Sequence, residues 1–230
     1  MNHKTKIALI GYGKMGQEID ALCRDSEVFE VVSISFKNNL PAQAGNDKLD
    51  LKGIAKADIA IDFTSKDVVL KNIEAVAKLG VNLVVGTTGW YKDLEMVKKL
   101  VTKYKIGFLY SPNFSIGANI FFKMIDSASK LFAKFPDYDV YGLEIHHKAK
   151  LDSPSGTALK IAEKIKGLKF TSVRAGRNPG FHEVTFDSSA DGITLSHQAY
   201  NRSGFGKGAL VAAEFIKNKK GIYTFDDVMK

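Results

Sequence analysis

A strand-like run, a glycine-rich turn and a helical pattern follow one another at the start of this 230-residue chain, and this succession constrains the fold more than any other feature. The run is residues 6–10 (KIALI), whose nearly unbroken apolar character suits a strand buried on both faces. The turn, Gly11–Gly16, fits the pattern G-x-G-x-x-G, and apolar residues recur at helical spacing over 15–24. Strand, glycine turn and helix in this order are typical of the first unit of a parallel sheet.

The next hundred residues continue this alternation of strands and helices. The pattern predicts strands at 29–35, 58–63, 82–85 and 106–110, and helices at 66–79 and 94–104. Strands that alternate with helices pair in parallel through right-handed crossovers. The sequence therefore predicts an α/β fold with a Rossmann-like doubly wound parallel sheet.

The regular alternation of strands and helices ends after residue 113. The pattern beyond it predicts a long helix, a strand, a shorter helix and two more strands, at 116–135, 139–146, 157–165, 183–188 and 192–200. A long helix followed by antiparallel strands indicates a smaller α+β domain, which we place at residues 115–202. The tail, with a helix at 206–218, is too short for a domain and is expected to pack back on the first one. The first domain thus comprises residues 1–114 with 203–230.

Composition and charge exclude several classes of protein. No apolar run approaches the ~20 residues that span a bilayer, and the first residues lead into a strand rather than a signal peptide, so we expect a cytoplasmic protein without membrane contact. The 33 Lys and Arg against 25 Asp and Glu give a net charge of +8, but the basic residues are scattered and no zinc-finger spacing accompanies them, which argues against nucleic acid. The lone Cys23 cannot form an internal disulfide, and we expect a metal-free protein.

The glycine turn suits a dinucleotide. Gly11 would permit the tight turn, Gly13 would let a pyrophosphate approach the backbone, and Gly16 would let helix and strand pack closely. The N–H groups at the start of the helix would then face the phosphates. A purely structural glycine turn is the alternative, but its position at the first strand–helix junction favours the dinucleotide, so we assign dinucleotide binding to the first domain.

The end of the second strand bears on the choice of cofactor. Chains that bind NAD usually place an acid there, whereas this chain has Ser35, Phe36 and Lys37. Ser35 and Lys37 could accept a 2′-phosphate, so NADPH is the preferred cofactor, with NADH possible; the alternative is that Lys37 is merely solvated. Loops 86–89 and 111–115 follow the fourth and fifth strands at the same carboxyl edge. The residues expected to bind the cofactor are Gly11, Tyr12, Gly13, Lys14, Met15, Gly16, Ser35, Lys37, Gly86, Thr87, Thr88, Ser111, Pro112, Asn113 and Phe114.

The stretch 144–158 (EIHHKAKLDSPSGTA) carries the most chemistry. Two imidazoles and two ammonium groups lie within 146–150, at the end of a strand, and residues 155–157 (SGT) then open a helix. Such a turn presents N–H groups and hydroxyls to a carboxylate, and Lys150 adds a full charge, which predicts a site for a small anion, with a dicarboxylate favoured. Either His146 or Lys150 could supply the proton that accompanies hydride addition.

This stretch allows two other interpretations. A metal held by His146 and His147 is disfavoured because adjacent strand residues point to opposite faces and no third ligand is evident. The structural alternative is that Ser155 is only the N-cap of a helix that follows a solvated basic loop. For any one of these residues taken alone, this structural interpretation would be favoured over a binding site.

The chain resembles the 4-hydroxy-tetrahydrodipicolinate reductase family (older name dihydrodipicolinate reductase) of diaminopimelate and lysine biosynthesis. The resemblance runs nearly end to end and is most specific in the stretch 144–158. It rests on Gly11–Gly16, Asp62-Phe63-Thr64, Gly86-Thr87-Thr88-Gly89, Asn113-Phe114-Ser115, His146–Ala158 and Gly221–Met229. It implies NAD(P)H-dependent reduction of a cyclic dicarboxylate to tetrahydrodipicolinate by a homotetramer, with the second domain binding the substrate and forming the tetramer through its sheet. The implied roles are proton donor or acceptor for His146, proton donor for Lys150, and substrate binding for His147, Ser155, Gly156 and Thr157.

The sequence departs from the family pattern in four places. The family's glycine turn often has one more residue, and the Arg that follows it is Lys14 here. An acid–Arg pair found in some members is replaced by Phe36 and Lys37, which argues against a preference for NADH. The segment between Ser35 and Asp58 is also short.

Two alternative functions stay open at this point. One is another two-domain NAD(P)-dependent dehydrogenase, although a semialdehyde dehydrogenase would need a nucleophilic cysteine and Cys23 lies inside the first helix. The other is a non-catalytic NAD(P)-sensing regulator, which would explain the glycine turn but not the imidazoles and ammonium groups of 146–150.

Overall fold

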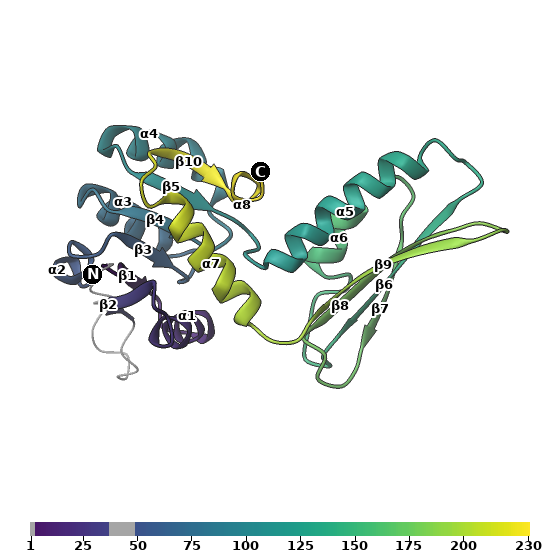
Figure 1. Ribbon diagram of the computed structural model, residues 1–230, viewed down its shortest axis with the longest axis horizontal. Coiled ribbons are helices and arrows are strands. Elements are labelled where there is room, and N and C mark those ends of the chain that lie inside the picture. Colours follow the sequence, from purple (N-terminus) through teal and green to yellow (C-terminus); the bar gives the residue numbers. More distant parts are fainter. Residues whose placement is uncertain (1–2, 37–48) are drawn as a thin grey trace. The chain divides into compact units, whose positions relative to one another are not determined.

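The computed structural model describes residues 3–36 and 49–230 (Figure 1), so the predicted cofactor contact of Lys37 lies outside the described residues. The chain divides into two compact units. Unit 1 consists of the residues up to Ser115 together with Ser203–Lys230, and unit 2 is Ile116–Arg202. Within the described ranges, no helix combines the length and the apolar character needed to cross a membrane.

Unit 1 is built on a six-stranded sheet in which every paired strand is parallel to its neighbour. In spatial order the strands are β10 (Gly221–Thr224), β5 (Gly107–Tyr110), β4 (Asn82–Val85), β3 (Ile59–Asp62), β1 (Thr5–Ile10) and β2 (Phe29–Ser35). The chain runs from β1 to β2 and then crosses to the other side of β1, so the strand order reverses between β1 and β3. The predicted doubly wound sheet is thereby confirmed, and such a reversal is where these sheets bind ligands.

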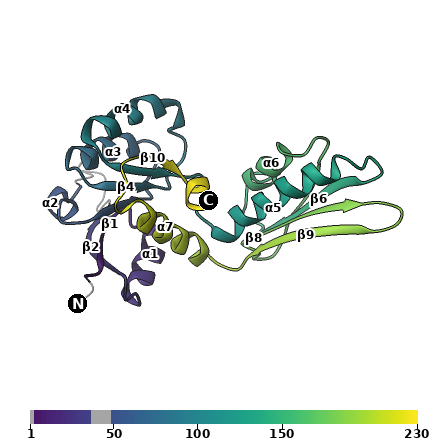
Figure 2. The same ribbon diagram turned by 45° about the horizontal axis from the view of Figure 1, so that its top comes forward.

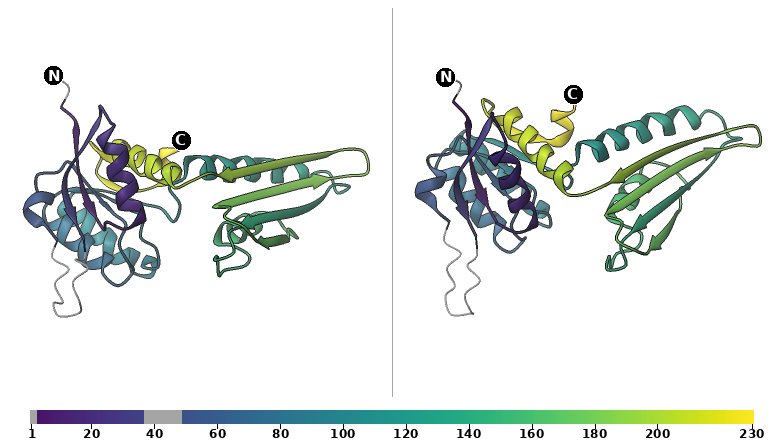
Figure 3. Two further views of the ribbon diagram at one scale, coloured as in Figure 1. Left: turned by 90° about the horizontal axis from the view of Figure 1, so that it is seen from below. Right: turned by 60° about the horizontal axis from the view of Figure 1, so that its bottom comes forward.

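Helices cover both faces of this sheet (Figure 3). They are α1 (Lys14–Arg24), α2 (Leu51–Ile54), α3 (Val69–Lys78), the short 3₁₀ helix η1 (Tyr91–Asp93), α4 (Leu94–Tyr104), α7 (Ser203–Ile216) and α8 (Phe225–Val228). On one face α3 and α4 bury Ile73 and Val97 against the strands. On the other, α7 packs against α1 so closely that a Cβ on Gly206 would lie 2.8 Å from Leu22 Cδ1.

Unit 2 is the smaller α+β domain that the sequence predicted. Its elements are α5 (Ile116–Phe132), β6 (Asp139–His146), α6 (Gly156–Ala162), β7 (Phe170–Arg174), β8 (Gly180–Asp187) and β9 (Gly192–Ala199). The sheet order is β7-β6-β8-β9, with β7 parallel to β6 and the other pairs antiparallel; β8 and β9 form a long hairpin (Figure 2). Helices α5 and α6 cover one face through a core that includes Phe121, Phe122, Ile161 and Val184.

Some elements differ from the sequence-based expectation. Helix α5 ends at Phe132 rather than at 135, because Pro136 disfavours helical backbone at the residue before it. Strands β7 and β10 and the short helix α2 were not predicted. Helix α2 begins where the Asp50 carboxylate accepts a hydrogen bond from Gly53 N at 2.9 Å.

Candidate functional site

The glycine turn joins β1 to α1, and its three glycines differ in what they would contact. Gly11 has φ = +91°, and a Cβ there would lie 2.5 Å from Phe63 O. A Cβ on Gly16 would lie 2.2 Å from Gly11 O, whereas a Cβ on Gly13 would meet nothing within 4 Å. The protein's own packing therefore requires Gly11 and Gly16, while Gly13 borders open space that a ligand can approach.

Two cavities of unit 1 open beside this turn, at the reversal between β1 and β3. The first has a volume of about 680 Å³ and the second about 610 Å³, within the usual range for small-molecule sites. Of the residues predicted to bind the cofactor, those that line one cavity or both are Gly11, Tyr12, Gly13, Lys14, Met15, Ser35, Gly86, Thr87 and Thr88. Loops from four separate strands thus meet at one edge of the sheet.

The segment after β5 does not line either cavity. Phe114 is buried, and its ring packs edge-on against those of Phe63 and Phe225. The Ser111 hydroxyl donates a hydrogen bond to Asn113 O at 2.8 Å. Cofactor contacts by Ser111, Pro112, Asn113 and Phe114 therefore stay a prediction.

A buried carboxylate ties the loops of the cavities together. Asp62, at the end of β3, accepts hydrogen bonds from Thr64 N, Thr64 Oγ1, Thr87 Oγ1 and Asn72 Nδ2 at 2.7–2.9 Å. Its burial raises its pKa, while these hydrogen bonds act in the opposite direction. The Thr87 hydroxyl is thus engaged by the protein itself, so its part in the site is to hold the loop after β4 against the loop after β3.

Where the glycine turn and the end of β2 line the first cavity, they contribute two aromatic side chains. The rings of Tyr12 and Phe36 lie 5.9 Å apart, and Phe36 is 53% exposed. The Tyr12 hydroxyl donates to Asp20 Oδ2 at 2.5 Å, and this hydrogen bond is the main reason that the pKa of Tyr12 is raised. Ser35 is buried and its hydroxyl accepts from Asp50 N at 2.9 Å. Among the described residues, neither Ser35 nor Phe36 offers an acid to a ribose, and the Asp50 carboxylate beside β2 instead accepts from Ser33 Oγ at 3.0 Å and Gly53 N at 2.9 Å.

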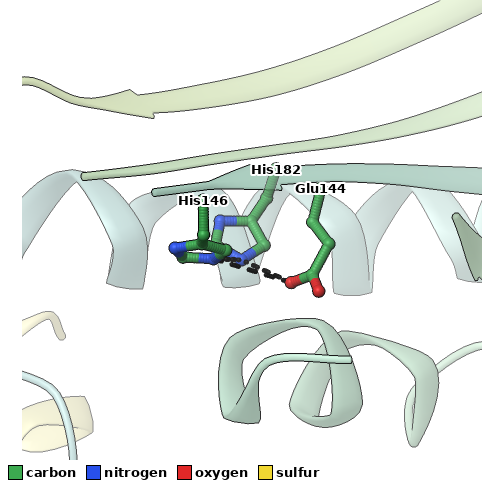
Figure 4. Close-up of side chains that lie close together, drawn as sticks. All are labelled: Glu144, His146 and His182. Carbon is green, nitrogen blue, oxygen red and sulfur yellow. Dashed lines mark hydrogen bonds and ion pairs between the residues drawn. The ribbon is translucent and has the colours of Figure 1, made fainter. Parts of the chain in front are cut away.

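In unit 2, three side chains from two neighbouring strands converge under the sheet (Figure 4). Glu144 and His146 share one face of β6 because they are two residues apart, and the antiparallel register places His182 of β8 opposite Glu144. His146 Nε2 and His182 Nε2 are 3.3 Å apart, and each lies close to Glu144 Oε2, at 3.6 and 3.5 Å. All three side chains are buried.

Glu144 is held as a carboxylate by several donors. Arg174 Nη2 lies 2.6 Å from Oε1, Ser172 Oγ donates to the same oxygen at 2.7 Å, and Ser155 N reaches both oxygens at 3.0 and 3.2 Å. Burial alone would raise the pKa of Glu144, but the hydrogen bonds from Ser155, Ser172 and Arg174 outweigh it and lower the pKa to about 2.

The two imidazoles are neutral near pH 7. Burial lowers the pKa of His146, and the opposing charge of Glu144 does not reverse this. Burial together with the neighbouring His146 lowers the pKa of His182 to about 4. The ligand-type atoms of Glu144, His146 and His182 lie within 4.8 Å of one another, which is close enough for a metal ion. Because Arg174 already neutralises Glu144, however, we assign the cluster to hydrogen bonding.

The loop between β6 and α6 holds the other predicted site residues. Lys150 Nζ pairs with Asp152 Oδ1 at 2.8 Å and is 25% exposed, while His147 is half-buried and Gly156 is exposed. Thr157 is half-buried. The structure therefore places these groups where a ligand can reach them.

Ser155 has a different environment from its neighbours. It is 1% exposed, its hydroxyl accepts from Ala158 N as the N-cap of α6, and the same oxygen lies 3.0 Å from His182 Nε2. The N-cap alternative from the sequence is therefore present. The hydroxyl of Ser155 faces the buried cluster, and its predicted contact with the substrate stays a prediction.

Two members of the cluster, His182 and Arg174, were not found from the sequence. His182 is 36 residues from His146, and only the antiparallel register of β6 and β8 brings them together. The alternation along β8, with Gly180, His182 and Val184 on the buried face, is the sequence pattern that could have indicated a buried His182. Arg174 ends β7, a strand that was itself not predicted.

Comparisons with known proteins bear on both units. The family model for the N-terminus of dihydrodipicolinate reductase matches residues 5–114, and the model for its C-terminus matches residues 117–229. The 4-hydroxy-tetrahydrodipicolinate reductase of Christiangramia forsetii is 37% identical over 242 residues, covering 97% of each chain. That of Methanosarcina acetivorans is 35% identical over 237 residues, covering 92% of this chain and 87% of its own. Among solved structures, dipicolinate-bound dihydrodipicolinate reductase from Paenisporosarcina sp. TG-14 superposes with a TM-score of 0.82 at 26% identity, covering 98% of this chain and 99% of that one.

Proposed function

The chain belongs to the dihydrodipicolinate reductase family. We propose that unit 1 binds the nicotinamide cofactor and unit 2 binds the substrate. The chain is an NAD(P)H-dependent oxidoreductase of diaminopimelate and lysine biosynthesis, which acts on a cyclic dicarboxylate. The two alternatives, a different dehydrogenase and a non-catalytic regulator, are not favoured, because the family match spans both units and includes the stretch 144–158. The observation that carries the proposal is the buried His146 beside the accessible Lys150 loop.

The two cavities of unit 1 fit a dinucleotide. Gly13 borders open space, and the loops after β1, β3 and β4 surround it. When bound, a reduced nicotinamide supplies the hydride. The residues that would hold the dinucleotide are the predicted ones that line the cavities, and Asp62 would keep their loops in place.

NADPH is the cofactor that we propose. The support is the absence of an acid at the end of β2 within the described residues, together with Ser35 and the sequence neighbour Lys37. Steady-state assays with either nucleotide test this. We expect a higher kcat/KM with NADPH, and values within a few-fold of each other, or a preference for NADH, would refute it.

The proposed substrate residues lie on the loop after β6. Lys150, His147 and the donors of Gly156 and Thr157 would bind the two carboxylates and orient the ring. The substrate loses its hydroxyl together with one proton as water, and the conjugated imine that results gains a hydride and a proton. The protein's own tasks are therefore to pass the proton lost from the ring to the departing hydroxyl, which leaves as water, and to deliver one further proton, drawn from solvent, with the hydride. His146, which is neutral near pH 7, is suited to this, with Lys150 as a further donor.

Site-directed variants test these roles. His146→Ala and Lys150→Ala should each lower kcat by roughly 10²-fold, the usual loss for a proton-transfer group, and His147→Ala should mainly raise KM. Lys148→Ala is a matched control, because Lys148 is an exposed ammonium group of the same loop. Near-normal turnover in both the His146 and the Lys150 variants would refute the assignment.

A homotetramer assembled through the sheet of unit 2 is the proposed assembly. The face of this sheet away from α5 and α6 carries Tyr141 at 50% exposure and Val173 at 37%, beside the half-buried Leu143, Ile145 and Phe181. An apolar face of this kind suits burial against other copies. Light scattering after gel filtration should give four chains, and a monomer would contradict the proposal.

A cytoplasmic location is also proposed, because the reaction consumes reduced nicotinamide, which cells maintain there. Cell fractionation followed by immunodetection tests it. Recovery of the protein outside the cytoplasmic fraction would refute it.

A further inference from the structure

The first cavity of unit 1 offers an apolar surface that none of the roles described above uses. The apolar side chains in its lining are Ile10, Tyr12, Phe36, Leu49, Phe63 and Val68. Among them Phe36, which comes directly after β2, is 53% exposed. A single exposed ring is ordinary on a protein surface, but this one shares a cavity with other apolar side chains. Such a lining suits a flat, apolar part of a ligand.

The two cavities of unit 1 differ in their charged lining residues. Lys14 and Lys66 line the second cavity, and ammonium groups suit phosphates. In the described lining of the first cavity the charged residue is Asp67. Its carboxylate has no hydrogen-bond or ion-pair partner among the described residues, so it can accept a hydrogen bond from the exocyclic amine of a base. Both cavities include Gly13, so a dinucleotide whose pyrophosphate lies at the glycine turn can place its base in the first cavity.

Tyr12 supports the ring of Phe36 on one side. The centroids of the two rings lie 5.9 Å apart, with 42° between the ring planes. Tyr12 is itself held in place, because its hydroxyl donates to the buried carboxylate of Asp20, which also pairs with Arg24. A base inserted between the two rings would need them ~7 Å apart, since stacked atoms lie ~3.5 Å from one another. A ligand therefore uses the remaining exposed surface of Phe36.

We propose that Phe36, supported by Tyr12, is the surface on which the adenine ring of the cofactor stacks. This inference rests on the proposed binding of a dinucleotide in unit 1, and it adds a residue to those expected to hold the cofactor. Every base has a π-face, and stacking on an aromatic side chain needs no particular substituent on the sugar. Because NADPH and NADH carry the same base, Phe36 strengthens the binding of both and does not decide between them.

Calorimetric titrations of Phe36 variants of the full chain test the proposal. Phe36→Ala should raise the Kd values of NADPH, NADH and ADP by a common factor of roughly tenfold or more, the scale of one lost base–aromatic stack. At saturating NADPH and substrate, kcat should change little, because the base is remote from the hydride that is transferred. Phe36→Trp keeps an aromatic face and should bind all three ligands within a few-fold of wild type. Val32→Ala is the matched control, because Val32 is a 37% exposed apolar residue of β2 that lines neither cavity.

The three ligands separate base stacking from other roles of the ring. A loss confined to NADPH would place Phe36 at the 2′-phosphate, and a loss for NADPH and NADH but not for ADP would place it at the nicotinamide half. Either result, or unchanged Kd values in Phe36→Ala, would overturn the inference. Failure of the wild type to bind NADPH would instead remove the proposed cofactor site itself. With a wild type that binds and oxidises NADPH, the results for the Phe36 variants bear on this inference alone.

Discussion

Replacing Glu144 by glutamine removes one buried charge while keeping the size of the side chain. The pKa of Glu144 lies at about 2 in the folded protein against an ordinary 4.5, a difference that corresponds to roughly 3 kcal/mol at about 1.4 kcal/mol per unit. Allowing for residual screening by solvent, we expect about 2 kcal/mol of the stability of unit 2 to depend on this charge. The donors that would lose the charge are Arg174, Ser172 and Ser155 N.

The sign of the pH dependence follows from the depressed pKa. A carboxyl group whose pKa is lowered by folding stabilises the protein fully above its unfolded value, and this stability is lost as the pH falls toward the folded value. The loss for Glu144 therefore falls between about pH 5 and pH 2. At pH 7 the Glu144→Gln variant should be less stable than wild type by the full amount, and by pH 3 more than half of that difference should have disappeared.

Amide hydrogen exchange resolved by strand measures this effect where it arises. At pH 7 the protected amides of β6 and β8 should exchange about 30-fold faster in Glu144→Gln, the equivalent of about 2 kcal/mol, while those of β3 and β4 in unit 1 should be unchanged. Glu163→Gln is the matched control, because Glu163 is an exposed carboxylate of unit 2 just after α6, outside the cluster. Equal protection at pH 7, or a destabilisation of the same size at pH 3, would refute the reasoning.

Three further predictions concern unit 1. Gly11→Ala should destabilise the fold, because φ is +91° and the new Cβ would lie 2.5 Å from a backbone oxygen. Gly13→Ala should have the same melting temperature as wild type but bind NADPH at least about tenfold more weakly, as calorimetry can show. Equal stability and equal NADPH affinity of the two variants would contradict this. Asp62→Ala leaves several buried donors unsatisfied and should lower the stability by at least about 3 kcal/mol in urea titrations followed by the fluorescence of Trp90, the single tryptophan. Cys23 should resist iodoacetamide at pH 8 until the protein unfolds, because burial raises its pKa to about 11, and rapid labelling of the folded protein would disprove this.

The strands and helices that could be predicted are those whose pattern is local. Strand β6 was predicted to the residue, because inward and outward side chains alternate along it. Strands β7 and β10 escaped because each is short and lacks a fully buried residue, so its hydrophobic pattern is weak. Their identity as strands is decided by neighbours that are distant in the sequence.

In the candidate site, too, the residues that could be predicted are those identified by local spacing, and the others depend on contacts that are distant in the sequence. The positions of Gly11 and Gly16 in the turn follow from a spacing that is visible within six residues. His182 joins His146 only through the register of two antiparallel strands, and a shift of one residue would turn it to the other face. The environment of Ser155 likewise depends on Glu144 and His182, so its sequence context could suggest a cap but could not show which way its hydroxyl faces.

The discontinuity of unit 1 affects how the chain can fold during translation. Strand β10 pairs with β5, and α7 packs on α1. Strand β5 and helix α1 precede unit 2 in the sequence, whereas α7 and β10 follow it. During synthesis, the side of β5 that β10 will cover therefore stays unpaired until after all the strands of unit 2 have been made. A chain that ends before residue 203 therefore contains every strand of unit 2 but an incomplete nucleotide domain, whose exposed β5 edge can pair wrongly until Ser203–Lys230 is available.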